Sequence, residues 1–145
     1  MPDPFPDRCV KLCDRRPRIV LRDRGERREY RAENPRRRLV TEIVVDGCCM
    51  VQETACDFLL LVDDDDAYLI ELKGSDVSKA IQQIHATLDR FEKALQPRTI
   101  HARVVPTRVP VPNYIATAEK ELRNRLRRLG KGNYKAKSRV LEETL

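Results

Sequence analysis

Two apolar runs in the middle of the chain are the clearest structural signal in the sequence. Residues 58–62 and 67–72 each have the length of a buried strand, and turn-favouring residues bound them. The four consecutive aspartates of residues 63–66 join the runs as a solvated turn, because a calcium loop would need spaced ligands and a central glycine. The pattern therefore predicts a central hairpin.

Further elements are predicted before this hairpin. β-Branched residues predict a strand over residues 39–45, and the turn signal Asp46-Gly47 is followed by a return that begins at residues 49–52. Residues 18–30 fit either a small hairpin or a short helix. Residues 1–17, rich in proline and charge, are expected to form an extended lead-in.

Helical periodicity begins just after the central hairpin. Ser75 or Asp76 can cap a helix that continues to Leu95 with one apolar face, and Gln96-Pro97 ends it. A strand is then predicted over residues 99–105.

The last third of the chain is predicted to be less regular. Pro106, Pro110 and Pro112 limit regular structure, and residues 109–112 can form only edge or extended chain. Residues 117–129 form a predicted helix with a narrow leucine stripe among basic residues. Residues 140–141 either add a strand or pack loosely.

Charge is distributed unevenly along the 145 residues, whose net charge is +6. Residues 1–38 carry 13 Lys or Arg against 7 Asp or Glu, and residues 97–145 carry 12 against 4, whereas residues 39–96 carry 4 against 12. An acidic middle between basic flanks fits a protein that holds a polyanion by its flanks, although solvated surface arginines would give the same composition. We expect one domain, with residues 1–38 as a basic lead-in packed on the core, residues 39–105 as the core, and residues 106–145 as a basic helix and tail.

Membrane and secretion signals are weak in this sequence. No stretch reaches the ~20 apolar residues of a membrane span, and the first residues lack the charged start and apolar segment of a signal peptide. Five cysteines, an odd number, fit a reducing compartment better than a disulfide framework. These features predict a cytoplasmic protein with no membrane partner.

A structural zinc site is the rival interpretation of the cysteines. The spacings do not match a regular zinc knuckle, and Cys49 and Cys56 fit buried apolar positions equally well. No glycine-rich phosphate-binding motif is present, so ATP hydrolysis by this chain alone is not expected. The candidate zinc ligands are Cys9, Cys13, Cys48, Cys49 and Cys56, with His85 or His101.

Three charged residues stand at the ends of the two central runs. Asp57 precedes the first run, and Glu71 and Lys73 close the second. Burying such groups without a task would be costly, and two carboxylates suit a hard divalent cation such as Mg²⁺ or Mn²⁺. A lysine beside that metal can orient or deprotonate a water, or stabilise developing negative charge. The plain alternative is an exposed ion pair between Glu71 and Lys73 at a strand end.

At these residues the chain resembles the PD-(D/E)xK nuclease superfamily, over residues 40–105. The superfamily pattern is an Asp on one strand and then, after a variable gap, Asp/Glu-x-Lys on the next. Asp57, Glu71 and Lys73 match this pattern, with Cys56 in place of the preceding proline. The resemblance implies that Asp57, Glu71 and the carbonyl of Leu72 bind the metal, and that Lys73 assists the attacking water.

The resemblance also implies a fold and a supporting glutamine. The expected fold is α/β and restriction-endonuclease-like, with a central mixed sheet of about four to five strands flanked by helices. Gln83 is the better candidate for the glutamine and Gln82 the alternative, although both would also fit solvated helix positions. An acid from the N-terminal side often joins such sites, and the candidates, left open, are Glu29, Glu33, Glu42 and Glu53.

The function implied by the resemblance is divalent-metal-dependent hydrolysis of phosphodiester bonds, with DNA favoured over RNA. A chain of this size would be structure-selective and resolvase-like, or a nuclease subunit of a defence or mobile-element system. A homodimer or a partner protein would then supply the targeting. The alternative is a catalytically inactive nuclease-fold module that binds nucleic acid or a protein. The expected phosphate contacts are Arg36, Arg37, Arg38, Arg123, Arg127 and Arg128.

Overall fold

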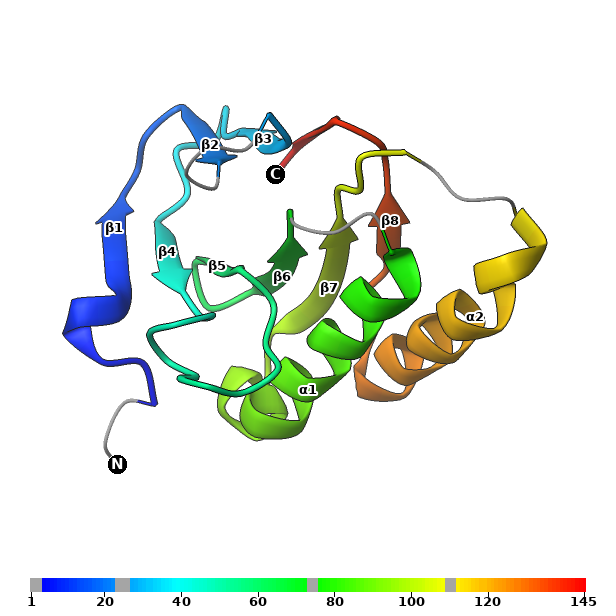
Figure 1. Cartoon of the computed structure of the whole chain (residues 1–145). Helices are drawn as coiled ribbons and strands as arrows, with labels where there is room; N and C mark the ends of the chain where they lie inside the picture. Colours follow the sequence, from blue (N-terminus) through cyan, green and yellow to red (C-terminus); the bar gives the residue numbers. More distant parts are fainter. Residues whose placement is uncertain (1–3, 23–26, 73–75, 109–111) are drawn as a thin grey trace.

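The computed structural model is an α/β fold built around a mixed six-stranded sheet (Figure 1). It describes residues 4–22, 27–72, 76–108 and 112–145, without the side chains of residues 112–115. In spatial order the strands are β1 (Val10–Asp14), β4 (Val40–Val44), β5 (Phe58–Val62), β6 (Asp66–Glu71), β7 (Thr99–Val104) and β8 (Tyr134–Ala136).

Strand direction divides the sheet into two halves. β1, β4, β5 and β6 pair antiparallel, whereas β6, β7 and β8 pair parallel. Each parallel step is made through a helix, α1 (Val77–Leu95) and then α2 (Pro112–Leu129). The two helices lie side by side over one face of β6, β7 and β8 (Figure 1). Within the described part of the chain, no helix is both long and apolar enough to cross a membrane.

A second, three-stranded sheet covers the other face. It consists of β2 (Arg18–Arg22), β3 (Glu29–Glu33) and β9 (Val140–Thr144), with β3 in the middle. Alternate residues of the central strands therefore enter two cores. Leu59 packs beneath α1, and its neighbour Leu60 packs against the small sheet. Burial on both faces explains why β5 and β6 are continuous apolar runs in the sequence.

The central elements were predicted from the sequence and are confirmed. β5 covers residues 58–62, and β6 and β7 agree with their predicted ranges to within one residue at each end. The N-cap of α1 is Asp76, whose carboxylate accepts hydrogen bonds from the amides of Ser78 and Lys79. Of the two structures predicted for residues 18–30, the hairpin is the one formed.

The expectation of about four to five strands flanked by helices needs correction. The main sheet has six strands, and the helices described lie on one of its faces. The predicted lead-in contributes β1 after a short 3₁₀ turn, Asp7–Cys9, and the tail contributes β8 and β9. β1 is an edge strand whose residues are half-buried or exposed, and β8 has only three residues, so neither produces a strong apolar signal.

Two further boundaries differ from the prediction. Residues 49–52 are irregular, with an isolated bridge between Asp46 and Met50, and the strand that returns beside β4 is β5 itself. The second helix begins at Pro112 rather than at residue 117. Proline is well tolerated in the first turn of a helix because the amide it lacks would have no partner there.

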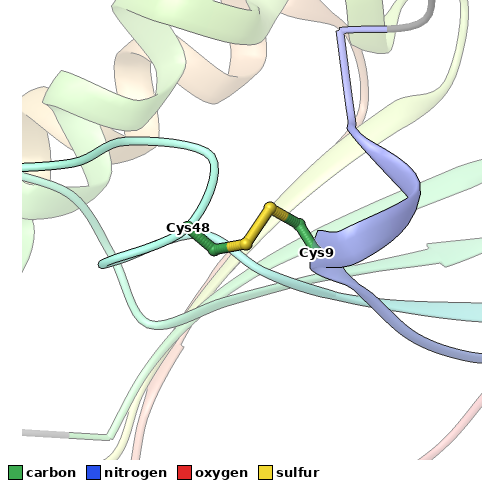
Figure 2. The surroundings of a disulfide bond; sticks show 2 residues. All are labelled: Cys9 and Cys48. Atoms are coloured by element: carbon green, nitrogen blue, oxygen red, sulfur yellow. A yellow bond between two sulfur atoms is a disulfide. The ribbon is translucent and has the colours of Figure 1, made fainter.

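A disulfide joins Cys9 to Cys48, which corrects the expectation that the cysteines are all reduced (Figure 2). The bond connects the 3₁₀ turn before β1 to the segment of residues 45–57 that leads into β5. Disulfides persist in oxidising environments, so the cysteine content no longer supports the predicted reducing compartment.

Gly132, between α2 and β8, is expected to tolerate no side chain. A Cβ atom built there would lie 1.6 Å from the carbonyl oxygen of Ile100 in β7, so Gly132→Ala forces the backbone apart. We expect this variant to lower the free energy of unfolding by about 3 kcal/mol, at the upper end of overpacking effects, as measured by urea unfolding. Gly130→Ala is the matched control, because no atom lies within 4 Å of its Cβ position. Equal unfolding midpoints for the two variants would contradict the prediction.

Candidate active site at the ends of the central strands

Asp57 lies directly before β5, and the surrounding backbone holds it in place. The residue is buried, and its Oδ2 accepts a 2.8 Å hydrogen bond from the amide of Leu72. Its own carbonyl accepts a 3.0 Å hydrogen bond from the amide of Val45, the residue after β4. Asp57 therefore ties the start of β5 to the residue that follows β6.

Glu71 is the last residue of β6 and is completely buried. β5 and β6 pair antiparallel with Phe58 opposite Ile70, and one further step in this register sets Asp57 opposite Glu71. Side chains of directly opposed residues leave the same face of the sheet, with Cβ atoms about 4.5–5.5 Å apart. The hairpin thus brings the two predicted carboxylates together.

The acid pair lies on the sheet face that α1 covers. Leu59 and Leu69, two residues further along each strand and on the same face, belong to the core beneath that helix. Burial raises the pKa of the neighbouring Cys56 thiol, and the charges of Glu71 and Asp57 raise this pKa further. Both carboxylates therefore lie close enough to the buried Cys56 thiol for their charges to shift its pKa.

The lysine of the predicted site, Lys73, lies outside the described residues. The described chain ends at Leu72, which is completely buried, and resumes at Asp76, the N-cap of α1. Lys73 is two residues after Glu71 in the sequence, and its role is a proposal.

Gln83 is on the side of α1 that faces the segment before β5. Its Nε2 donates a 3.3 Å hydrogen bond to the carbonyl of Ala55, two residues before Asp57. Thr87, one turn later, accepts a hydrogen bond from the amide of Cys56 and donates one to the carbonyl of Gln83. Gln82, the alternative, is exposed. Of the two glutamines, Gln83 is therefore the one that contacts the segment leading to Asp57.

The donors at this place fit a hard divalent cation. Mg²⁺ is commonly held by one or two carboxylates and completes its coordination with waters or substrate phosphates. Asp57 and Glu71 supply two carboxylates, and the carbonyl of Leu72 follows directly in the chain. Within the described ranges, no group of three or more His, Cys, Asp or Glu side chains is arranged to hold a metal. Waters and substrate oxygens would therefore provide the remaining ligands.

The candidate acids from the N-terminal side are all engaged away from the pair. Glu29 is bound by Arg22 and Arg31 in the small sheet. The Oε1 atom of Glu42 lies 3.7 Å from the Nζ atom of Lys11, and burial raises the pKa of the Glu42 carboxyl. The remaining two form surface ion pairs, Glu33 with Arg18 and Glu53 with Arg90.

The predicted phosphate contacts Arg36, Arg37 and Arg38 lie at the opposite end of β5 and β6. Arg38 binds Asp63 and Asp66 at 3.0 Å each, at the turn that joins these strands. A five-residue strand spans roughly 17 Å, which separates this turn from the acid pair. Arg38 stabilises this turn through its ion pairs, and the exposed Arg36 and Arg37 directly precede it in the chain.

The arginines predicted on α2 are also remote from the acid pair. α2 runs from the end of β7 to the start of β8, so its last turn, with the exposed Arg127 and Arg128, lies at the far edge of the sheet. The guanidinium of Arg123 lies over the Tyr134 ring, 5.0 Å from its centre. The structure does not bring these residues to Asp57 and Glu71.

The zinc ligands considered from the sequence are dispersed. Cys9 and Cys48 are joined in the disulfide, and Cys56 is buried beside the acid pair. The imidazole of His85 contacts Arg125, and that of His101 contacts Asp66 on β6. These contacts give the cysteines and histidines structural roles and do not bring them together as zinc ligands.

Cationic residues that the sequence did not single out gather at the edge of the sheet where β6, β7 and β8 end. They follow the ends of β7 and β8 or flank the β2–β3 turn, and they are Arg28, Arg108, Lys137 and Arg139. The signal that could have found them is their position directly after strand ends, where loops from different parts of a parallel sheet meet.

Comparisons of the chain with protein-family models, curated proteins and solved structures give no significant match.

Proposed function

We propose that the chain is a divalent-metal-dependent nuclease with a restriction-endonuclease-like fold. The observation that carries the proposal is the buried pair of Asp57 and Glu71, set opposite each other by the register of β5 and β6. The order β4, β5, β6, α1, β7, an antiparallel meander followed by a parallel crossover, supports the fold assignment. DNA is the favoured substrate, and a second copy or a partner protein is the proposed source of targeting.

In this proposal each residue has a defined task. Asp57 and Glu71 would hold Mg²⁺, with the carbonyl of Leu72 as a further ligand, and Gln83 positions the segment that carries Asp57. A bound Mg²⁺ supplies charge to the phosphoryl oxygens and lowers the pKa of a coordinated water. Lys73 would orient the attacking water and stabilise the negative charge that develops as the phosphodiester bond breaks. Burial of the two carboxylates keeps bulk water away and strengthens these electrostatic effects.

The test is cleavage of supercoiled plasmid, linear duplex, single strand, four-way junction and RNA with Mg²⁺ or Mn²⁺. We expect Glu71→Gln and Lys73→Ala each to lower the cleavage rate by roughly 10²-fold or more, because each removes a group that acts on the reacting phosphate. Asp64→Asn is the control, since that carboxylate is fully exposed in the turn at the far end of the same hairpin. Cleavage that persists unchanged in Lys73→Ala would reject the proposal.

A catalytically inactive nuclease-fold module is the second candidate. It is favoured by the finding that, within the described residues, no group of three or more His, Cys, Asp or Glu side chains is arranged to hold a metal. Calorimetric titration with Mg²⁺ separates the two functions. Heat of binding that disappears in Asp57→Ala supports the nuclease, and no heat in either protein supports the module.

A further inference from the structure

Three chain segments meet where β6, β7 and β8 end, a region termed here the carboxyl edge and defined by Glu71, Val104 and Ala136 (Figure 1). The amide of Val105 donates a 2.9 Å hydrogen bond to the carbonyl of Glu71, and the amide of Lys137 donates one of 3.2 Å to that of Val104. The residue after β7 is thereby fixed at the backbone of Glu71, and the residue after β8 at the backbone of Val104.

The same edge is joined to the small sheet. The amide of Arg139 donates a 3.0 Å hydrogen bond to the carbonyl of Pro106, and the amide of Glu29 donates one of 3.0 Å to the carbonyl of Arg139. The side chain of Arg28 donates a 3.0 Å hydrogen bond to the hydroxyl of Thr107. Four backbone segments, far apart in the sequence, therefore form one bonded surface.

The side chains on this surface are cationic. Arg108, Lys137 and Arg139 are exposed, and in the described part of the chain none of them forms an ion pair with an acidic side chain. The backbones of Glu71 and Lys137 are two strand spacings apart, roughly 10 Å, so phosphates held by Lys137 would lie near the end of β6. The acids of the edge have other contacts, Asp57 with the amide of Leu72 and Asp76 with the first turn of α1.

Aromatic side chains are absent from this surface as far as side chains are described. Single-stranded nucleic acid is usually held by bases stacked on exposed aromatic rings, whereas a duplex can be held through its phosphates alone. All six phenylalanine and tyrosine side chains described are buried: Phe5, Tyr30, Phe58, Tyr68, Phe91 and Tyr134.

From this surface we infer that the carboxyl edge binds the phosphate backbone of duplex nucleic acid, independently of base sequence, through Arg108, Lys137 and Arg139, with Arg28 bracing the loop. The inference rests on the proposed function in taking nucleic acid as the ligand. It replaces the arginines that the sequence suggested with residues at the edge of the sheet where β6 ends. Binding through phosphates alone releases counterions, so affinity should fall steeply with salt and should be weaker for single strands.

The test is fluorescence anisotropy of labelled duplex DNA and of a single strand of equal length, with the full chain in EDTA so that no metal-dependent cleavage occurs. We expect Arg108→Gln/Lys137→Gln/Arg139→Gln to bind the duplex at least about tenfold more weakly. The slope of log affinity against log salt should become shallower by about three. Arg15→Gln/Lys93→Gln/Lys131→Gln removes the same charge from exposed positions elsewhere and should change neither quantity.

Three results would overturn the inference: no binding of duplex DNA, an equal loss of duplex affinity in the two triple variants, or a single strand bound as tightly as the duplex. Loss of binding in Arg127→Gln/Arg128→Gln, with the carboxyl-edge variant unaffected, would place the interface on α2 and would also overturn it. If the triple variant is unstable, the single variants Lys137→Gln and Arg139→Gln are measured in its place. If the duplex binds at the carboxyl edge but no cleavage depends on Glu71, only the proposed nuclease activity is rejected. If the chain cleaves DNA and the carboxyl-edge variant binds the duplex as tightly as the wild type, only the inferred binding surface is rejected.

Discussion

Glu143→Gln is expected to lower the free energy of unfolding by about 3–5 kcal/mol, because it leaves the buried Arg103 without its counter-ion. Arg103 on β7 donates two hydrogen bonds to the Glu143 carboxylate on β9, of 2.7 and 3.1 Å. The side chains are only 2% and 10% exposed. The hydroxyl of Tyr30 donates a further 2.8 Å bond to the same carboxylate. This group connects the six-stranded sheet to the small sheet.

The measurement is urea unfolding, with Glu142→Gln as the matched control. Glu142 is the preceding residue of β9 and is exposed, so its loss should change stability by less than about 0.5 kcal/mol. A double variant, Arg103→Met with Glu143→Leu, should recover part of the loss because it leaves no charge buried. Equal unfolding midpoints for Glu143→Gln and Glu142→Gln would show that the ion pair between Arg103 and Glu143 contributes nothing to stability.

The same ion pair predicts a dependence of stability on pH. Burial acts to raise the pKa of the Glu143 carboxyl, but the hydrogen bonds and charge of Arg103 outweigh it, and the pKa is lowered from its ordinary value of 4.5. A carboxyl with a lowered pKa stabilises the folded state above the unfolded-state pKa, and this contribution is lost as the pH falls through the folded-state value. The free energy of unfolding should therefore fall on acidification below about pH 4.5, and this component should be missing in Glu143→Gln.

Loss of the Cys9–Cys48 disulfide is expected to cost about 4 kcal/mol of stability. The bond closes a loop with a sequence separation of 39 residues, and a crosslink of that span removes considerable entropy from the unfolded chain. It also holds residues 45–57, which end in Asp57, against the 3₁₀ turn before β1. The variant is Cys9→Ser with Cys48→Ser, compared with the wild type in urea unfolding, with and without reductant.

Cys13→Ser is the control for this prediction, because Cys13 is exposed and free. Alkylation of the denatured, unreduced chain should modify three thiols, those of Cys13, Cys49 and Cys56, and alkylation after reduction should modify all five. Five reactive thiols before reduction would contradict the disulfide. An unchanged unfolding midpoint in the double variant would contradict its stabilising role.

The acid pair was accessible from the sequence because it depends on local structure. Asp57 and Glu71 flank one hairpin, and the apolar runs between them determine both its pairing and the faces on which alternate residues lie. The cap of α1 and the position of Gln83 on that helix follow from helical periodicity in the same way.

The surroundings of the pair depend on contacts between distant segments and could not be predicted. Arg38 looked like a phosphate contact because it stands in a run of arginines, but the aspartates of the β5–β6 turn bind it. Lys137 and Arg139 looked like part of a basic tail, but parallel pairing of β8 with β7 and of β9 with β3 brings them to the edge that contains Glu71. The disulfide partner of Cys9 was equally hidden, since five cysteines allow many pairings.

By itself, the sequence determined the α/β class, the central hairpin and the helix that follows it, since apolar periodicity, capping and turn residues act over a few neighbouring positions. Only the tertiary structure decided that the helices lie on one face, that terminal segments form a second sheet over the other, and which cations lie at the carboxyl edge. Those features depend on pairings of β3 with β9 and β7 with β8, which are separated by long stretches of chain. Such pairings are set by the burial of whole faces, which no local pattern specifies.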